Sequence, residues 1–170
     1  PDSGYGLFET DNTALRPTIS LADSWVTVPG PGVTTDTITI LAWIKPTTLV
    51  ANGGIVFARA GQPATALNLN GTGNLGYHWL DAAATYQFDS GLTPAVNQWS
   101  LAALVVEPDQ ATIHMINAGG AQSAVNTATH APRGFTDNLR IGGYPNNVNR
   151  NFDGIIDEVA IFNTALAPAE

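Results

Sequence analysis

The sequence predicts an all-β fold, a sandwich of two antiparallel sheets. Short stretches rich in Val, Ile, Thr and aromatic residues alternate with Gly, Pro, Asn and Asp along most of the chain, which is typical of strands joined by turns. No window of a dozen residues keeps a helical period without glycine or proline. Many short strands at a spacing of about 8–12 residues indicate a sandwich or a jelly roll.

The strands follow from local patterns. Thr37 to Ile40 alternates polar and apolar residues, as a half-buried strand does. The segment 70–74 contains the Gly and Asn residues that a hairpin turn with positive φ requires. A second tight turn is expected at 107–110, with Pro108 at its second position. The expected strands are 25–28, 37–45, 54–59, 65–69, 74–80, 84–89, 98–107, 110–117, 121–127, 138–142 and 153–162.

The composition of the chain excludes several classes of binding partner and of chemistry. At 170 residues, the chain can bury a single core without disulfides or metals. The net charge is 6 − 14 = −8, and the five arginines are scattered along the sequence. Nucleic acids and anionic membrane surfaces need clustered positive charge, so neither is expected as a partner. No apolar run approaches the ~20 residues that span a bilayer. Cysteine is absent, which excludes thiol catalysis and cysteine zinc sites.

The last third of the chain carries a distinctive string. Leu139–Gly143 (LRIGG) leads through a polar loop to Phe152–Leu166 (FDGIIDEVAIFNTAL). This string resembles the closing signature of laminin-G-like, concanavalin A-like jelly-roll domains. Three upstream blocks resemble the same family and occur in its order, so that the resemblance covers about residues 15–166. They are ADSWVTVP at 22–29, ITILAWIKP at 38–46 and LTPAVNQW at 92–99.

The resemblance implies a concanavalin A-like jelly-roll sandwich. We expect residues 1–170 to form one laminin-G-like module cut from a larger protein, with 1–14 as a tail or an irregular lead-in. No basic-then-apolar signal segment opens the chain, so we expect any export signal to have been removed or to lie outside this sequence. The scaffold hosts lectins, adhesion modules, spacers and some hydrolases, so the fold leaves the function open.

Enzymatic chemistry is not expected. Laminarinase-type jelly rolls carry an E-x-D-x-E strand, whose alternation places two carboxylates on one face. The four glutamates here never lie two or four residues apart. Jelly-roll polysaccharide lyases need a Gln-x-His strand and a basic Tyr-Lys cluster, but the surroundings of His114 do not match and Lys45 is the only lysine. No Gly-x-Ser-x-Gly elbow is present for a serine nucleophile. We therefore predict no catalytic residues.

One candidate glycan-binding cluster is Tyr77, His78, Trp79 and Asp81, followed by Tyr86. Strand alternation would place Tyr77, Trp79 and Asp81 on one face and His78 on the other. An aromatic pair that ends in a carboxylate suits a sugar-binding groove. The alternative is that both aromatic residues belong to the core beneath the other sheet. Exposure of Trp79 would separate these two interpretations.

A second candidate lies in the loop from Tyr144 to Asn151. The loop is rich in side-chain amides, including Asn147, and adds one aromatic ring and the guanidinium of Arg150. These groups can reach sugar hydroxyls. The alternative is a solvated, turn-rich loop.

Two tryptophans and one aspartate carry further expectations. Trp43 and Trp99 lie in strongly apolar stretches and are expected to be core residues more than half buried. Asp157 alternates with Ile155, Val159 and Ile161, so we expect all of them on one strand face. A carboxylate among such neighbours must be hydrogen-bonded or bound to a cation. The family resemblance implies structural Ca²⁺ as the cation, with Asp157 as a ligand.

We conclude from the sequence that the chain is a non-catalytic carbohydrate-binding module of a secreted, bacterial, polysaccharide-active enzyme. Its expected partner is a polysaccharide or glycan, and it is expected to act as a monomeric module in a multidomain chain at the cell surface or outside the cell. The alternatives are an adhesion, interaction or spacer module of a large extracellular surface protein, and a divergent hydrolase domain.

Overall fold

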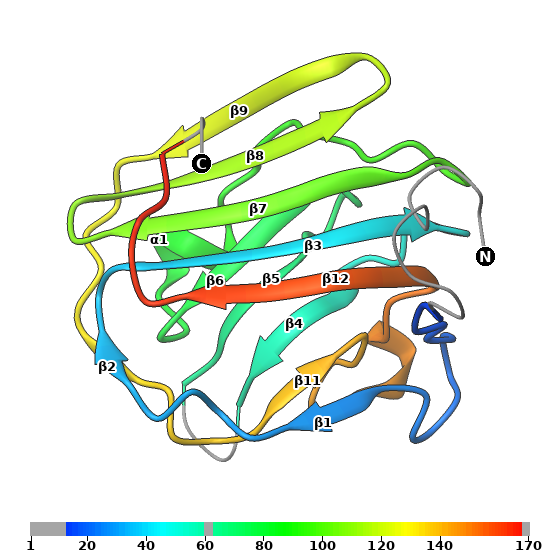
Figure 1. The fold of residues 1–170 in the computed structure, drawn as a ribbon, viewed down its shortest axis with the longest axis horizontal. Helices are drawn as coiled ribbons and strands as arrows, with labels where there is room; N and C mark the ends of the chain where they lie inside the picture. Colours follow the sequence, from blue (N-terminus) through cyan, green and yellow to red (C-terminus); the bar gives the residue numbers. More distant parts are fainter. Residues whose placement is uncertain (1–12, 60–62, 168–170) are drawn as a thin grey trace.

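Two five-stranded antiparallel sheets pack face to face in the computed structural model, which describes residues 13–59 and 63–167 (Figure 1). The β3 sheet has the strand order β12-β3-β7-β8-β9, and the β5 sheet has the order β1-β11-β4-β5-β6. Strands β2 and β10 pair separately at one end. The elements are β1 (Val26–Val28), β2 (Thr34–Thr35), β3 (Ile38–Pro46), β4 (Gly54–Ala58), β5 (Thr65–Leu69), β6 (Leu75–Trp79), α1 (Ala83–Tyr86), β7 (Ser100–Glu107), β8 (Gln110–Asn117), β9 (Gly120–Asn126), β10 (Arg133–Gly134), β11 (Leu139–Ile141), η1 (Val148–Arg150) and β12 (Gly154–Phe162). The predicted all-β jelly-roll sandwich is confirmed.

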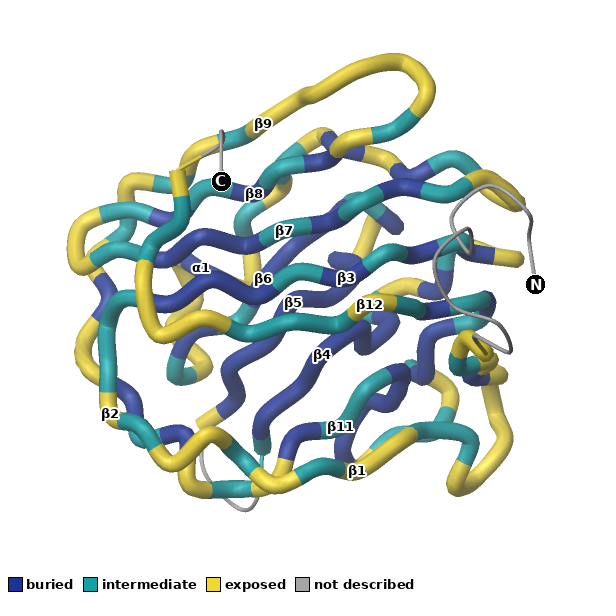
Figure 2. The backbone as a smooth tube through the Cα atoms, viewed as in Figure 1, coloured by how far each residue is buried: buried dark blue, intermediate teal, exposed yellow. Residues whose placement is uncertain are grey.

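The core lies between the two sheets and follows from period-2 alternation. In β3, the buried Ile40, Ala42 and Ile44 face the β5 sheet, and the half-buried Leu41 and Trp43 face outward. Figure 2 shows this alternation along β3 and the almost continuous burial of β4 and β5. Strands β4 and β5 are buried on both faces, so other side chains must cover their outer side. That cover forms the candidate site described below.

One predicted strand is wrong. Residues 84–89 were expected to be extended, but the structure has the short helix α1 and then irregular chain. The run of three alanines at 82–84 favours a helical turn. The hydroxyl of Thr85 donates to the carbonyl of Ala82 at 2.8 Å and accepts the Trp79 N–H at 2.9 Å. The short pair of β2 and β10 was not predicted, because two residues carry no periodic pattern.

A β-bulge in β12 changes the expected position of Asp157. The register with β3 shifts between Asp157 and Ala160, and Glu158 takes a left-handed φ of 48°. An extra residue in a strand reverses the alternation beyond it. Asp157 therefore shares the outer face with Ile155, while Val159 and Ile161 pack against the core. The expectation that all four share one face is wrong.

The chain before β1 joins the β3 sheet at its β12 edge. Leu15 and Ile156 exchange both backbone hydrogen bonds, at 2.9 and 2.8 Å. Most of the predicted tail or lead-in, residues 1–12, lies outside the described residues. Within the described ranges, no helix is long and apolar enough to cross a membrane.

Candidate functional site

The outer surface of the β5 sheet gathers residues from both predicted clusters. Strand pairing aligns Arg140 of β11 with Phe57 of β4, Phe57 with Ala66 of β5, and Ala66 with His78 of β6. Paired residues point to the same side of a sheet, so these side chains form a row across its outer face. We call the surface around this row the arginine face. Its members are Arg59, His78, Asp81, Tyr86, Arg140, Tyr144 and Arg150.

Stacked rings build the centre of the arginine face. The ring of Phe57 is fully buried and lies 4.6 Å from that of Tyr144 and 5.4 Å from that of His78, between centroids. His78 stacks on Tyr86 at 5.6 Å, with 25° between the ring planes. Tyr86 is 41% exposed, whereas Tyr144 is only 7% exposed. The stack thus runs from a buried phenylalanine to an exposed tyrosine.

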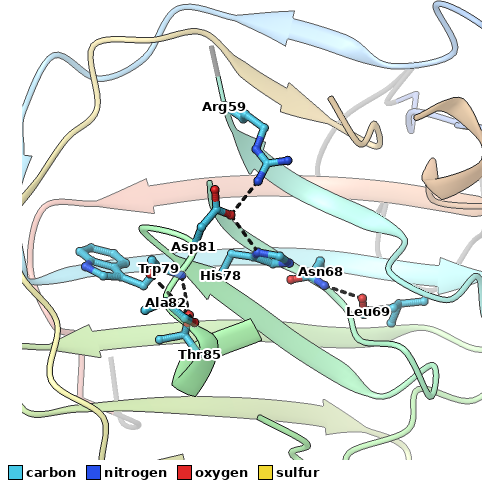
Figure 3. Close-up of polar contacts among 8 residues, drawn as sticks. All are labelled: Arg59, Asn68, Leu69, His78, Trp79, Asp81, Ala82 and Thr85. Carbon is cyan, nitrogen blue, oxygen red and sulfur yellow. Dashed lines mark hydrogen bonds and ion pairs between the residues drawn. The ribbon is translucent and has the colours of Figure 1, made fainter. Parts of the chain in front are cut away.

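A tight turn after β6 brings Asp81 to this face. Leu80 and Asp81 both have positive φ, 52° and 53°, and the N–H of Ala82 donates to the carbonyl of Trp79 at 3.0 Å. Two successive non-glycine residues in this conformation are strained, and such strain concentrates at functional sites. Figure 3 shows the result: the Asp81 carboxylate lies between Arg59 and His78, and the Trp79 ring extends away from them. The Asp81 Oδ1 atom lies 2.6 Å from Arg59 and 3.6 Å from Nδ1 of His78.

His78 is held neutral by its surroundings. Burial lowers the pKa of His78, and the positive charges of Arg59 and Arg150 add to that effect. The carboxylate of Asp81 opposes it without reversing it. The Nδ1 atom is buried and has no hydrogen-bond partner within the described part of the chain. The imidazole therefore contributes an aromatic surface to the arginine face at neutral pH, and the positive charge comes from guanidinium groups.

The three guanidinium groups lie over aromatic rings. Arg59 and Arg150 lie 5.9 and 5.1 Å from the ring centroid of Tyr144, and Arg140 lies 4.6 Å from that of Trp25. These are cation–π distances. Gly143 allows the last contact, because an added Cβ would lie 2.8 Å from Cγ of Trp25. The rings therefore fix the guanidinium groups above the sheet.

Two asparagines fix the loop that carries Tyr144 and Arg150. Asn147 caps η1 by accepting the N–H of Asn149 at 3.0 Å. Asn151 is fully buried; its Oδ1 accepts the N–H of Tyr144 at 3.3 Å, and its Nδ2 donates to the carbonyl of Leu21 at 3.0 Å. The loop is thus anchored to the segment before β1 rather than freely solvated.

Comparison with known proteins identifies the family. A laminin-G-type family model, described as the concanavalin A-like lectin/glucanases superfamily, matches residues 21–170. The chain belongs to this superfamily. No curated protein matches it in sequence.

Several solved structures share the fold of this superfamily domain. Domain 4 of AbnA, a GH43 extracellular arabinanase from Geobacillus stearothermophilus solved with arabinotriose, has 22% identity and a TM-score of 0.65, over 85% of this chain and 69% of that one. The CBM40 of the Ruminococcus gnavus IT-sialidase, bound to α2,3-sialyllactose, has 15% identity and a TM-score of 0.57, over 85% and 92%. Domains LG4-5 of the mouse laminin α1 chain have 14% identity and a TM-score of 0.61, over 88% and 40%.

Within the superfamily domain, Tyr77 and Trp79 are core residues. Each is only 1% exposed. Trp79 donates its indole N–H to the carbonyl of Ala131 at 2.8 Å, and the hydroxyl of Tyr77 bonds His130 at 3.0 Å and accepts from Asn126 at 2.8 Å. Burial raises the pKa of Tyr77 to about 12, against the opposing hydrogen bond from Asn126. The interpretation that they line an open groove is wrong and the alternative, that both are core residues, is confirmed, because strand alternation points both side chains at the β3 sheet.

The outer side of the β3 sheet is a second surface of the superfamily domain. A depression of about 400 Å³ there is lined by residues of β3, β7 and β12, among them Trp43, Asp157 and Glu158, and by Trp99 just before β7. Both tryptophans are more than half buried, as predicted, but neither belongs to the core between the sheets. Ala42 and Ile44, on either side of Trp43, face that core, so Trp43 points outward. The predicted burial is therefore confirmed, and the predicted position in the core is wrong. We call this surface the tryptophan face; its members are Leu41, Trp43, Lys45, Trp99, Leu101, Asp157 and Glu158.

The predicted calcium ligand belongs to the tryptophan face. Asp157 accepts the N–H of Glu158 through Oδ1 at 2.9 Å, so one carboxylate oxygen already has a partner. Among residues 13–59 and 63–167, no group of three or more His, Cys, Asp or Glu side chains is placed to hold a metal. A calcium ion at Asp157 would therefore take most of its six to eight oxygens from carbonyl groups or water.

Four residues of the site were not predicted from the sequence: Phe57, Arg59, Arg140 and Trp25. One signal was present for Arg140, since it stands between the apolar Leu139 and Ile141 of an alternating strand. No comparable signal links Arg59 to Asp81, because their contact depends on the pairing of β4, β5 and β6.

Proposed function

We propose that this domain is a non-catalytic carbohydrate-binding module and that its arginine face holds the glycan. The observation that carries the proposal is the 41% exposed ring of Tyr86, stacked on His78 beside the Arg59–Asp81 pair. An exposed ring packs on the C–H groups of a sugar, while nearby charged groups bond its hydroxyls. Aromatic and hydrogen-bonding groups are thus held together over the outer side of the β5 sheet.

The relatives support this proposal through their ligands. The arabinanase domain was solved with arabinotriose and the sialidase CBM40 with sialyllactose. Both belong to enzymes that act on glycans. By analogy, we place this domain in a secreted polysaccharide-active enzyme, where it would hold the enzyme on its substrate. The mode of binding on the arginine face is our own inference from its residues.

The carboxylates of the arginine face support a non-catalytic role. Glycoside hydrolysis generally uses two carboxyl groups on opposite sides of the scissile bond. Asp81 is the single carboxylate among the seven members of the face, and it is bonded to Arg59 at 2.6 Å. Such a pair suits a fixed hydrogen-bonding group better than a proton donor.

Substitution of Tyr86 tests the function. Tyr86→Ala should weaken glycan binding by about 1–3 kcal/mol, the scale of losing an aromatic contact at an interface. The melting temperature should hardly change, because the ring is largely outside the core. Trp43→Ala is the matched control, since it removes an aromatic ring from the other sheet. Binding is measured on a glycan array and then by calorimetry; the absence of any bound glycan would overturn the proposal.

An interaction module in a large surface protein is the second candidate. The depression between Trp43 and Trp99 favours it, because apolar hollows with a charged rim are common at protein interfaces. In that case, Trp43→Ala should abolish capture of the partner while Tyr86→Ala has no effect.

A further inference from the structure

The arginine face concentrates the positive charge of an acidic protein. The chain has six Lys and Arg residues against 14 Asp and Glu. Three of its five arginines, Arg59, Arg140 and Arg150, lie on this one face although they are far apart in the sequence. Arg59 and Arg150 both lie over the ring of Tyr144. Like charges repel at short range, so this arrangement has an electrostatic cost that a negatively charged ligand would offset.

Two of these arginines have no carboxylate partner among the described residues. Asp81 neutralises Arg59. Arg140 and Arg150 have aromatic rings beneath them instead, and no carboxylate of the described residues lies within 4.0 Å of either. Both side chains are half-buried. A guanidinium stacked on a ring keeps its N–H groups around its edge, where they can donate in pairs to a planar anion.

The positive charge of the arginine face is permanent, because guanidinium groups stay charged at all physiological pH values. Burial lowers the pKa of His78, so its imidazole adds no charge at neutral pH. The face therefore offers fixed positive charge together with an aromatic platform. Neutral sugars need only the platform and hydrogen-bonding groups. The guanidinium groups of Arg140 and Arg150, which pair with no carboxylate of residues 13–59 and 63–167, therefore point to an additional feature of the ligand.

We propose that the glycan taken by the arginine face is anionic, with its carboxylate or sulfate groups bound by Arg140 and Arg150. The inference rests on the proposed carbohydrate-binding function and adds the chemical class of the ligand. Paired N–H donors on a rigid guanidinium match both carboxylate and sulfate oxygens. The net charge of −8 repels a polyanion at long range, so binding depends on these local contacts.

Matched polysaccharides provide the probes. Polygalacturonate is compared with its carboxyl-reduced, neutral form, and dextran sulfate with dextran, so that each pair shares one backbone. The domain should bind at least one acidic polymer about tenfold more tightly than its neutral counterpart, and added salt should weaken that binding. Preference in the first pair assigns a carboxylate and preference in the second a sulfate.

Variants that remove single positive charges test whether Arg140 and Arg150 bind the acidic polymer. Arg150→Gln and Arg140→Gln should each reduce affinity for the acidic polymer about tenfold, the scale of one charged hydrogen bond. Lys45→Gln is the matched control, because it removes the same charge from the tryptophan face. Melting temperatures of all three should stay close to that of the unmodified domain. An equal loss in Lys45→Gln would show a bulk charge effect and overturn the inference.

The outcomes separate the two proposals. Tight binding of neutral polymers without preference for either acidic one would overturn the inference and leave the carbohydrate-binding function standing. Preserved affinity in both arginine variants, combined with loss of binding in Tyr86→Ala, would do the same. Failure to bind any polysaccharide on the array or in these pairs would overturn both.

Discussion

The two outer faces of the sandwich differ in how they are built. The tryptophan face comes largely from strand alternation: the inward Ala42 and Ile44 leave Trp43 pointing outward. The arginine face needs two segments between strands, 80–86 with α1 and 144–151 with η1, folded over β4, β5 and β6. Strands β4 and β5 are consequently buried on both sides, while β3 is buried on one.

The two faces also differ in the charge of their side chains. The seven members of the arginine face include three arginines and one aspartate, and those of the tryptophan face include Lys45 with Asp157 and Glu158. Aromatic rings therefore support opposite signs of charge on the two sides of one core. An aromatic surface alone therefore does not define the ligand; the fixed charge above the rings distinguishes the two faces.

The largest effect is expected inside the core that separates the faces. Trp79→Ala should lower the free energy of unfolding by about 3–5 kcal/mol, because it empties a packed site and removes an indole hydrogen bond. Tyr86→Ala, one short turn further along the chain, should cost well under half as much. Urea denaturation of both variants measures the difference. A mild effect of Trp79→Ala would mean that the sheets repack easily, and the contrast between core and face would weaken.

The sequence predicts the fold but only part of the candidate site. The strands, the hairpin turns and the family signature at 139–166 are local patterns, and the structure follows them closely. The alternation of Tyr77, His78 and Trp79 was also correct. Tyr77 and Trp79 were expected on the binding side of the strand, however, and they face the core, while His78 faces outward. Which side of a strand faces the other sheet depends on the packing of distant segments. The turn at Leu80 and Asp81 then moved the carboxylate to the side of His78.

The clustering of three arginines on one face could not be predicted from the sequence either. Arginines at 59, 140 and 150 are scattered in the sequence, and only strand pairing and the anchored loop bring them to one face. The bulge at Glu158 was equally invisible, since an alternating apolar pattern continues through it. Local patterns predict elements; long-range register and irregular backbone decide which side chains meet.

The next effect tests the tryptophan face. Trp43→Ala should lower the free energy of unfolding by about 1–2 kcal/mol, less than a full core substitution, because the ring lies outside the core and keeps part of its surface exposed. Glycan affinity should stay unchanged, since the ring lies on the opposite side of the core. Chemical denaturation and calorimetry check the two parts. A loss of glycan binding with intact stability would move the binding site to the tryptophan face.

Acidification should destabilise the domain through three histidines. His78 lies on the arginine face, His114 on the outer side of the β3 sheet, and His130 is buried beside Tyr77. Burial lowers the pKa of His78, His114 and His130 below the ordinary value of 6.5. Between the lowered pKa values and 6.5 the unfolded chain binds more protons than the folded one, so the free energy of unfolding falls as the pH drops through that range and is fully present above it. Urea denaturation at about pH 7.5 and pH 5.5 measures the change, since carboxylates stay largely ionised over this interval.

Single substitutions divide this pH dependence between the locations. His130→Gln removes the contribution from between the sheets, and His78→Gln that from the arginine face. Each variant should show a shallower loss of stability on acidification than the unmodified domain. A stability that rises as the pH falls through 6.5 would contradict the burial of these imidazoles.

The smallest effect concerns calcium at Asp157, which stays a proposal. A site supplied mainly by carbonyl groups and water is expected to be weak, with a dissociation constant of about 10⁻⁴–10⁻³ M as in extracellular modules. At ~1 mM Ca²⁺, such a site stabilises the domain by about 0.4–1.4 kcal/mol. Chelator should therefore lower the melting temperature slightly, and Asp157→Asn should abolish that response. Because Asp157 belongs to the tryptophan face, chelation should leave glycan affinity on the arginine face unchanged. An identical melting curve with and without chelator would contradict the calcium proposal. A loss of glycan binding in chelator would show that the two faces do not act independently.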